Sequence, residues 1–285
     1  MSQVFEFGKW IAEYDLQDGA RIGRLNYAGM DLVTTEPQKF KAPKADYGLY
    51  ETRPVYGYDD CFPSVEQCKY PDREREISDH GELCWLPWDI EIYANQLIFS
   101  VQSRELPIQF KRSMDFGESS LVWKFEVINK GKKSLPFQHV IHPLMPLNDV
   151  TDIEFPEFKS MNNDRGDEFY LKNPDELKDF LLNVLPGDFH MLFVQGTKDG
   201  RIGWTFKDSL RITMDYPLEL FPAIGIWWNN SGYPDESGCR RNECAFEPIP
   251  GKSSTLTDAV DDKLALIAEP SKPFAWKIMW NLEIS

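Results

Sequence analysis

Two segments that lie far apart in the chain each place an ionisable side chain inside an apolar run bounded by prolines. The first, residues 135–147, contains His142, and the second, residues 243–251, contains Glu247. A histidine and a carboxylate in such surroundings are sufficient to move protons near neutral pH, because one can act as a general acid and the other as a general base. Each residue alone is equally well explained as a hydrogen-bonded part of a protein interior, so the functional interpretation needs further support.

The spacing of residues gives less support to other kinds of chemistry. His139 and His142 are three residues apart, so in a regular strand they face opposite sides and cannot bind one metal ion without a bulge. Glu243 and Glu247 share a face, but they lie about 13 Å apart along a strand, which is too far for the paired carboxylates of a glycosidase. The chain has no glycine-rich phosphate loop and no Gly-x-Ser-x-Gly motif. We therefore expect no metal and no cofactor, and one of the two histidines to be structural.

The cysteines also argue against a metal centre. Their number is odd, their density is low, and their spacing matches neither a zinc ribbon nor a disulfide framework. They are Cys61, Cys68, Cys84, Cys239 and Cys244. We expect most of them to be buried thiols.

The elements that carry these side chains are mostly strands, because apolar and polar residues alternate along much of the chain. Residues 274–284 alternate in this way near the C-terminus, and residues 90–114 contain three such runs, which predict a meander of short strands. Residues 121–127 and 135–141 also alternate, and the turn-forming residues between them predict a hairpin.

One helix stands out from this pattern. Asn173 can cap it and Pro174 occupies its first position, ahead of an apolar stripe that ends at Val184. Nothing in the chain has the composition of a linker, an internal repeat or a low-complexity segment. We therefore predict an all-β fold, a large antiparallel sandwich with few short helices, in which residues 1–285 form a single domain.

Composition excludes several classes of partner. The chain has 31 basic and 46 acidic residues and a net charge of −15, which opposes binding to nucleic acid or to an anionic membrane surface. Its apolar runs are too short to span a membrane, and its first residues lack the features of a secretory signal. We expect a cytoplasmic protein, monomeric or homodimeric, that binds a small neutral molecule.

Several short motifs, taken in their order along the chain, resemble the galactose mutarotase superfamily, which includes the aldose 1-epimerases. The motifs are residues 19–32, Cys61-Phe-Pro-Ser64, Asp79-His-Gly81, Ile141-His-Pro-Leu144 and Phe246-Glu-Pro248. The resemblance covers much of the chain and implies the β-supersandwich of that family. It also implies that Glu247 is the catalytic base, that His142 is the general acid, and that His80 binds or assists the substrate.

Further residues near these motifs are candidates for binding a sugar. Asp79 belongs to the same turn as His80. Trp227, Trp228 and Asn230 belong to a segment that resembles the loop that closes over the ligand in these proteins. Aromatic rings in such a loop would suit the C–H faces of a pyranose.

The resemblance leaves the identity of the sugar open. Glu82 replaces the second glycine expected after His80, and residues 143–146 replace the Tyr-Phe-Asn-Leu of the galactose-specific branch. Arg112, together with Arg104 and Lys111, is a candidate for bonding sugar hydroxyls or the phosphate of a hexose 6-phosphate.

The function implied by the resemblance is that of an aldose 1-epimerase, which interconverts the α and β anomers of a monosaccharide. One base and one acid suffice for that reaction, because it opens and recloses the sugar ring by moving two protons. Two alternatives remain open: a carbohydrate-binding or sensing protein without turnover, and a hexose-6-phosphate epimerase. A lyase or glycosidase on the same scaffold is a further alternative.

Overall fold

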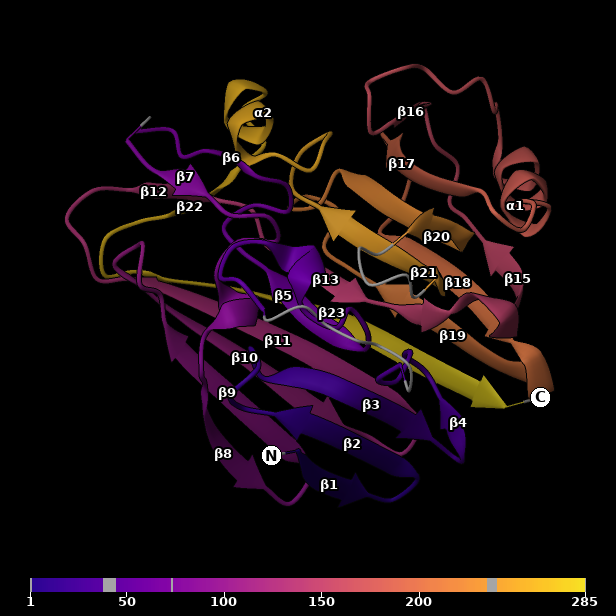
Figure 1. Ribbon diagram of the computed structural model, residues 1–285, viewed down its shortest axis with the longest axis horizontal. Helices are drawn as coiled ribbons and strands as arrows, with labels where there is room; N and C mark the ends of the chain where they lie inside the picture. The colour runs from indigo at the N-terminus through magenta and orange to yellow at the C-terminus, as the bar shows by residue number, and fades with distance from the viewer. Residues whose placement is uncertain (1, 38–44, 73, 235–239, 285) are drawn as a thin grey trace.

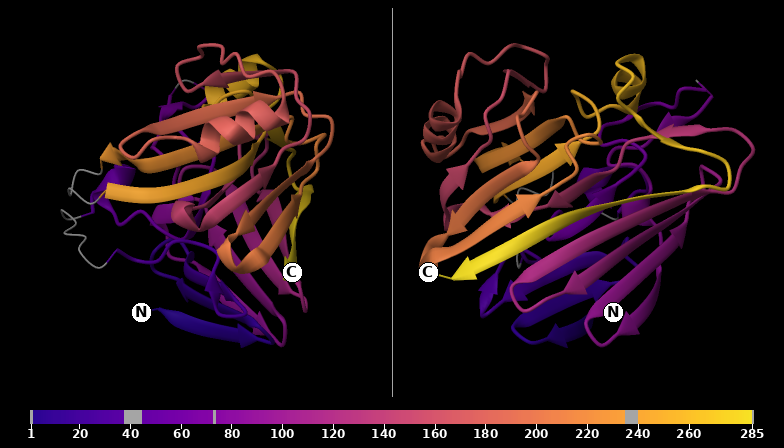
Figure 2. Two further views of the ribbon diagram at one scale, coloured as in Figure 1. Left: turned by 90° about the vertical axis from the view of Figure 1, so that its right-hand side faces the viewer. Right: turned by 180° about the vertical axis from the view of Figure 1, so that it is seen from behind.

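The computed structural model describes residues 2–37, 45–72, 74–234 and 240–284, and these residues fold mainly into antiparallel sheets. The largest sheet has eight strands in the order β15-β18-β19-β23-β11-β10-β9-β8. Their bounds are β8 Asp89–Tyr93, β9 Gln96–Gln102, β10 Ile108–Phe116, β11 Ser120–Asn129, β15 Val150–Glu154, β18 Arg201–Phe206, β19 Leu210–Asp215 and β23 Pro273–Ile284. Figure 2 shows β23, in yellow, crossing the molecule between β19 and β11.

Two sequence predictions are confirmed in this sheet. The three alternating runs of residues 90–114 form the meander β8-β9-β10, and the alternating C-terminal run forms β23. Trp276, Ile278 and Trp280 of β23 are buried because every second residue of a strand faces the same side. The capped helix is also confirmed as α1 (Pro174–Leu182), where the side chain of Asn173 accepts a hydrogen bond from the amide of Glu176.

The predicted hairpin between residues 121–127 and 135–141 is wrong. Strand β11 already pairs with β10 on one edge and β23 on the other, so it has no free edge for the segment that follows it. That segment instead forms β12 (Leu135–Phe137), which pairs with β22 (Leu266–Ala268). Asn129 holds the chain in a turn that leads away from β11 and toward β22. Its side chain donates hydrogen bonds to the carbonyls of Lys133 and Ala268 and accepts one from the amide of Gly131.

A second sheet packs on the first and contains the first five strands of the chain together with β13. It contains β1 (Gln3–Phe7), β2 (Trp10–Asp15), β3 (Arg21–Tyr27), β4 (Met30–Asp31), β5 (Tyr58–Cys61) and β13 (Val140–Pro143). Phe5 and Trp10 contact Phe116 of β10, and Tyr14 contacts Phe99 of β9. In Figure 1 these N-terminal strands accordingly cross in front of β9, β10 and β11. The two sheets bury aromatic faces against each other, which is the arrangement of a β-sandwich.

A third sheet extends the sandwich. It contains β14 (Met145–Pro146), β16 (Ser160–Asn163), β17 (Phe189–Gln195), β20 (Ala223–Pro234) and β21 (Arg240–Ile249). The chain passes from β13 to β14 through Leu144 alone, so the second and third sheets meet where His142 lies. The remaining elements are small: β6 (Cys68–Lys69) pairs with β7 (Glu76–Ile77), and α2 covers Leu256–Asp261. No helix among the described residues is long and apolar enough to cross a membrane.

One buried polar cluster lies inside the sandwich rather than at a cavity. The guanidinium of Arg112 donates hydrogen bonds to Asp60 and to the carbonyl of Ala20, and neither Arg112 nor Asp60 is measurably exposed at its side chain. His139 Nε2 lies 3.0 Å from the other oxygen of Asp60. Arg112 therefore ties β10 of the large sheet to β5 of the second sheet.

We expect replacement of Arg112 by leucine to lower the free energy of unfolding by about 3–5 kcal/mol, because Asp60 keeps a buried charge and loses its ionic partner. Urea unfolding followed by tryptophan fluorescence measures the change. Lys111→Leu is the matched control, since the ammonium of Lys111 pairs with Glu126 at the surface and should contribute less than about 1 kcal/mol. Equal losses in the two variants would contradict a structural role for Arg112.

Candidate active site

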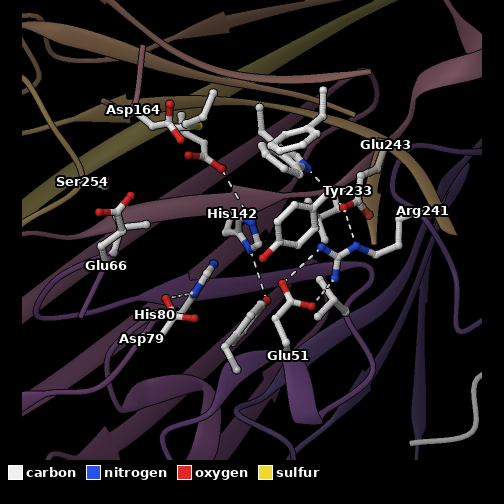
Figure 3. A pocket seen from close by; sticks show the side chains of 18 residues that line it. Glu51, Glu66, Asp79, His80, His142, Asp164, Tyr233, Arg241, Glu243 and Ser254 are labelled. Atoms are coloured by element: carbon white, nitrogen blue, oxygen red, sulfur yellow. Dashed lines mark hydrogen bonds and ion pairs between the residues drawn. The ribbon is translucent and has the colours of Figure 1, made fainter. Parts of the chain in front are cut away.

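A cavity of about 240 Å³ lies where the second and third sheets meet. Its walls come from the 3-10 turn Tyr50–Thr52, the turn that contains Asp79 and His80, and strands β13, β17, β20 and β21. His142 projects into the middle of the cavity (Figure 3). The site thus joins residues that are far apart in the sequence, as expected when long-range strand pairing positions the side chains.

The pairing of β5 with β13 holds His142 in place. Asp59 lies directly opposite His142 in the register, and its Oδ1 is 2.9 Å from His142 Nδ1. The hydroxyl of Tyr50 donates a 2.9 Å hydrogen bond to the other oxygen of Asp59. Because a carboxylate only accepts, Nδ1 of the ring carries the proton in this contact, which leaves Nε2 directed to the cavity.

Two buried arginines balance the charge of Asp59. Nη1 of Arg21 lies 3.9 Å from Asp59 Oδ2, and Nη1 of Arg53 lies 3.8 Å from it. Burial raises the pKa of Asp59, but the hydrogen bond to His142 and the charges of His142 and the two arginines outweigh burial and hold it far below its usual range. Asp59 is therefore a permanent anion that orients His142.

Glu247 faces His142 across the cavity. It lies on β21, and its Oε1 is 3.8 Å from His142 Nε2, a separation that leaves the two groups in ionic contact but too far apart for a direct hydrogen bond. Burial raises the pKa of Glu247, and the charges of His142 and His80 only partly offset the rise. Gly225 lies opposite Glu247 on β20, and a side chain there would come within 3.3 Å of the carboxylate.

The pKa of His142 is set by two opposing effects. Burial lowers it, but the hydrogen bond to Asp59 and the charges of Glu247, Asp59 and Glu243 raise it by more, so the net shift is upward. The protonated form of His142 is thus favoured at a pH where an isolated imidazole is largely neutral. The site therefore pairs an imidazole and a carboxylate whose pKa values are both raised.

His80 lies in a tight turn that requires a glycine at the next position, Gly81. Its φ is +58° and that of Gly81 is +68°, and a Cβ atom on Gly81 would lie 1.9 Å from the carbonyl oxygen of Phe62. The imidazole stacks on the ring of Tyr50 with centroids 3.6 Å apart, and its Nδ1 lies 2.9 Å from Asp79 Oδ1. As with His142, a carboxylate at Nδ1 leaves Nε2 free for a ligand.

The opposite wall of the cavity contains a charged group that the sequence interpretation missed. Arg241 forms a bidentate ion pair with Glu51, with nitrogen–oxygen distances of 2.9 and 3.2 Å, and its Nε lies 3.0 Å from Glu243. The indole nitrogen of Trp227 donates to the same Glu243 carboxylate at 3.2 Å. Arg241 lies two residues before Glu243, which shares a strand face with Glu247, so the same period of two could have found Arg241, whereas no local signal indicates Glu51.

The structure places some predicted sugar-binding residues at the cavity and others elsewhere. Asp79 and Trp227 line the cavity. Trp228 is adjacent to Trp227 and therefore faces the other side of β20, where it is buried near Phe246. The amide of Asn230 is used inside the protein, since it donates to the carbonyl of Val184 and accepts from Asn242.

Two related expectations also need correction. The segment 227–234 was expected to form a closing loop, but it is the second half of strand β20, with a register shift between Asn230 and Pro234. Arg112 lies in the sandwich interior against Asp60, and it does not line the cavity. Neither Arg104 nor Lys111 lines the cavity.

One group of side chains at the site has the composition of a metal-binding set. Ligand atoms of Cys61, His80 and His142 lie within 4.8 Å of one another. Both histidines already bond a carboxylate through Nδ1, as metal-binding histidines commonly do, and sulfur with imidazole suits a metal such as zinc. Burial raises the pKa of the Cys61 thiol well above its usual value, which opposes formation of the thiolate ligand.

The other described cysteines contribute no ligand to this group. Cys84 and Cys244 are buried free thiols and Cys68 is a half-buried one, whereas Cys239 lies outside the described residues.

We expect Asp59→Asn to lower the pKa of His142, because the neutral amide removes both the charge and the strongest acceptor at Nδ1. The chain has only four histidines, so an NMR titration of the imidazole signals can follow each one separately. His139 is the internal control, because its carboxylate partner is Asp60 rather than Asp59. An unchanged titration of His142 would show that Asp59 does not set its protonation.

Comparison with known proteins bears on the fold. No family model and no curated protein matches the chain. Among solved structures, the Slr1438 protein from Synechocystis sp. PCC 6803 is similar with a TM-score of 0.78 at 14% identity, over 100% of this chain and 96% of that one. A candidate aldose 1-epimerase from Escherichia coli K12 gives a TM-score of 0.76 at 15% identity, over 100% and 99% of the two chains.

A galactose mutarotase-like protein from Lactobacillus casei ATCC 334 gives a TM-score of 0.70 at 17% identity, over 99% of this chain and 100% of that one. These similarities extend over whole chains, and they agree with the sheet order and packing described above. The predicted all-β supersandwich is therefore confirmed, and the chain has the galactose mutarotase-like fold.

Proposed function

We propose that the protein is an aldose 1-epimerase that interconverts the anomers of a monosaccharide, with Glu247 as base and His142 as acid. The observation that carries this proposal is the 3.8 Å separation of His142 Nε2 from the Glu247 carboxylate, two buried side chains that line one cavity. The reacting oxygens of a cyclic sugar, the anomeric hydroxyl and the ring oxygen, are bonded to one carbon. An acid and a base that act on them must therefore be close neighbours.

The reaction follows from the protonation states at the site. Glu247 removes the proton of the C1 hydroxyl while protonated His142 donates its Nε2 proton to the ring oxygen, and the bond between C1 and the ring oxygen breaks. The open-chain aldehyde rotates about its C1–C2 bond and exposes its other face. Neutral His142 then takes the proton back from the C5 hydroxyl as the ring recloses, and Glu247 returns its proton to the C1 oxygen. No proton or electron is gained or lost overall.

The remaining walls of the cavity suit a small sugar. Its volume of about 240 Å³ lies below the roughly 300–1,000 Å³ of pockets for drug-sized ligands, which favours a monosaccharide over an oligosaccharide. Phe189, Trp227 and Tyr233 contact one another with ring centroids 5.3 to 5.7 Å apart, and all three line the cavity. Their rings can support the C–H face of a pyranose, and His80 Nε2 can bond a hydroxyl.

Two of the similar structures support the same proposal by their descriptions. One is a candidate aldose 1-epimerase and another is a galactose mutarotase-like protein. A glycosidase needs two carboxyl groups about 5 to 9.5 Å apart on opposite sides of a glycosidic bond. Here the partner of Glu247 is an imidazole held much closer.

Polarimetry of freshly dissolved α-anomers of glucose, galactose, xylose and their phosphates tests the activity. Acceleration over buffer alone, retained after treatment with EDTA, is the expected result, because both proton-transfer groups are side chains. If no sugar equilibrates faster than in buffer, the proposal fails. Saturable binding without mutarotation would instead identify a sugar-binding or sensing protein, and a new product on chromatography would identify a lyase or glycosidase.

Substitution of the two proposed catalytic residues should separate chemistry from binding. Glu247→Gln and His142→Asn should each lower kcat by roughly 10²- to 10⁴-fold, the usual cost of losing a positioned proton donor or acceptor. His80→Asn should raise KM as well as lower kcat, because His80 is proposed to hold a hydroxyl. His139→Asn is the matched control, since His139 is an equally buried histidine that contacts Asp60 away from the cavity. A folded and fully active Glu247→Gln protein would overturn the assignment.

The rate should depend on pH with a bell-shaped profile. It should fall on the acid side as Glu247 becomes protonated, at a pH above the ordinary glutamate value of about 4.3, because burial raises the pKa of Glu247. It should fall on the alkaline side as His142 loses its proton, above the ordinary histidine value of about 6.5, because the pKa of His142 is also raised. Measuring kcat/KM from pH 4 to pH 10 provides the test, and an alkaline limb below the ordinary histidine value would contradict the role of His142.

A further inference from the structure

The charges around the cavity are strongly unbalanced. Six carboxylates line it, and among the described lining residues a single arginine or lysine accompanies them. The carboxylates are those of Glu51, Glu66, Asp79, Asp164, Glu243 and Glu247, and the cation is Arg241. Figure 3 shows Glu66 and Asp79 on the opposite side of His142 from Arg241, so negative charge surrounds the proposed reaction centre.

The single arginine is not available to a ligand. Both terminal nitrogens of Arg241 pair with Glu51, its Nε lies 3.0 Å from Glu243, and its guanidinium packs 5.2 Å from the ring centroid of Tyr233. Burial lowers the pKa of Arg241, but the charges of Glu243 and Glu51 and the hydrogen bond to Glu51 raise it by more. An anionic ligand could bind Arg241 only by displacing a carboxylate that already fits it in bidentate geometry.

The other side of the cavity carries negative charge without such compensation. Glu66 and Asp164 line the cavity, and neither forms an ion pair with a lysine or arginine among the residues that the structure describes. Asp79 bonds His80, and the pKa of Asp79 is lowered overall because the charge of His80 and its hydrogen bond outweigh burial. A phosphate or carboxylate on the ligand would therefore meet like charges, whereas an ammonium would meet acceptors.

We propose that this cavity selects its sugar by charge: it accepts neutral and amino sugars and rejects sugars that carry a phosphate or carboxylate, with Glu51 and Glu243 acting as specificity determinants that hold Arg241. This inference rests on the proposed function for the reaction, but it concerns only which substrates enter. It argues against one alternative that the sequence left open, the hexose-6-phosphate epimerase, because a hexose 6-phosphate would be a poor substrate.

Glucose, glucuronate and glucosamine form a suitable set of probes, because they are similar in size and differ in charge. The rates are compared at low ionic strength and at a pH where the amine is protonated. We expect kcat/KM for glucuronate to be at least about 10-fold below that for glucose. We expect kcat/KM for glucosamine to equal or exceed that for glucose. Glucose 6-phosphate should behave like glucuronate. Added salt should reduce the differences in kcat/KM between these sugars, because ions screen the exposed carboxylates that line the cavity. Anomer exchange measured by NMR gives these rates.

Two variants that each remove one negative charge separate two effects: the pairing of Arg241 with Glu51, and the repulsion of anionic sugars by the carboxylates of the cavity. Glu51→Gln removes one carboxylate and frees Arg241 from its bidentate partner, so it should raise kcat/KM for glucuronate relative to glucose by roughly 10-fold. Glu66→Gln removes one carboxylate and leaves Arg241 paired, so it should raise that ratio by less than about 3-fold. Using ratios cancels a general loss of activity in either variant. Equal changes in the two ratios would overturn the role assigned to Glu51 and Arg241.

The wild-type protein alone can also refute the inference, whichever variants fold. Equal or better turnover of glucuronate or glucose 6-phosphate than of glucose would overturn the charge selection while leaving the epimerase activity intact. If no sugar is turned over, the proposed function fails, and calorimetric binding of the same three probes decides the charge selection separately. Binding in the order glucosamine, glucose, glucuronate supports it, and absence of binding or the reverse order overturns it.

Discussion

The hydrogen bond between Asp59 and His142 is the contact on which the site depends. It exists only because β5 and β13 pair in the register that places these two residues opposite each other. A shift of the register by one residue would turn one of the two side chains to the other face of the sheet. The buried guanidinium groups of Arg21 and Arg53 keep Asp59 ionised, so the fold supplies an anion at a position where burial alone would favour the neutral acid.

Strand β21 connects this contact to the rest of the fold. One of its faces presents Arg241, Glu243 and Glu247 to the cavity, and the opposite face packs Cys244 and Phe246 into the hydrophobic core. Because alternate residues of a strand face opposite sides, the same strand places Cys244 and Phe246 in the core and the proposed base, Glu247, at the cavity. A substitution that shifted β21 against its neighbours would alter the separation of Glu247 from His142, on which the proposed proton transfer depends.

The sequence predicts what is local or strongly periodic in this structure, and it fails where distant segments choose their partners. Strand β23 and the meander β8-β9-β10 follow from alternation, and the cap at Asn173 follows from residue type. The hairpin after β11 was wrong because both edges of that strand were already paired with β10 and β23. The alternation within one segment carries no information about which edges of its neighbouring strands remain free for pairing.

The same limit applies to the site. Ordered motifs indicated His80, His142 and Glu247, and the structure brings all three to one cavity. Asp59 and Glu51 were missed because their partners are distant in the sequence and no spacing links them. The assignment of Arg112 failed for the same reason. Residue type alone cannot show whether an arginine in a strand faces a cavity or an aspartate in the core.

The two adjacent aspartates of β5 show how the fold gives two similar histidines different chemistry. Asp59 bonds His142 at the cavity, and Asp60 bonds His139 in the core, and both pairs are buried. Burial lowers the pKa of His139, and the charge of Arg112 lowers it further, so the bond to Asp60 does not compensate.

His142 has an equivalent aspartate, and it also faces the carboxylates of Glu247 and Glu243. Burial lowers its pKa too, yet the charges of Glu247 and Glu243 add to the effect of the hydrogen bond that Nδ1 donates to Asp59, and the net shift is upward. The opposite pKa shifts of His139 and His142 therefore arise from the other charges near each ring rather than from the two aspartates. Those charges come from β10 for His139 and from β21 for His142, so the packing of the sheets sets the direction of the pKa shift of each histidine.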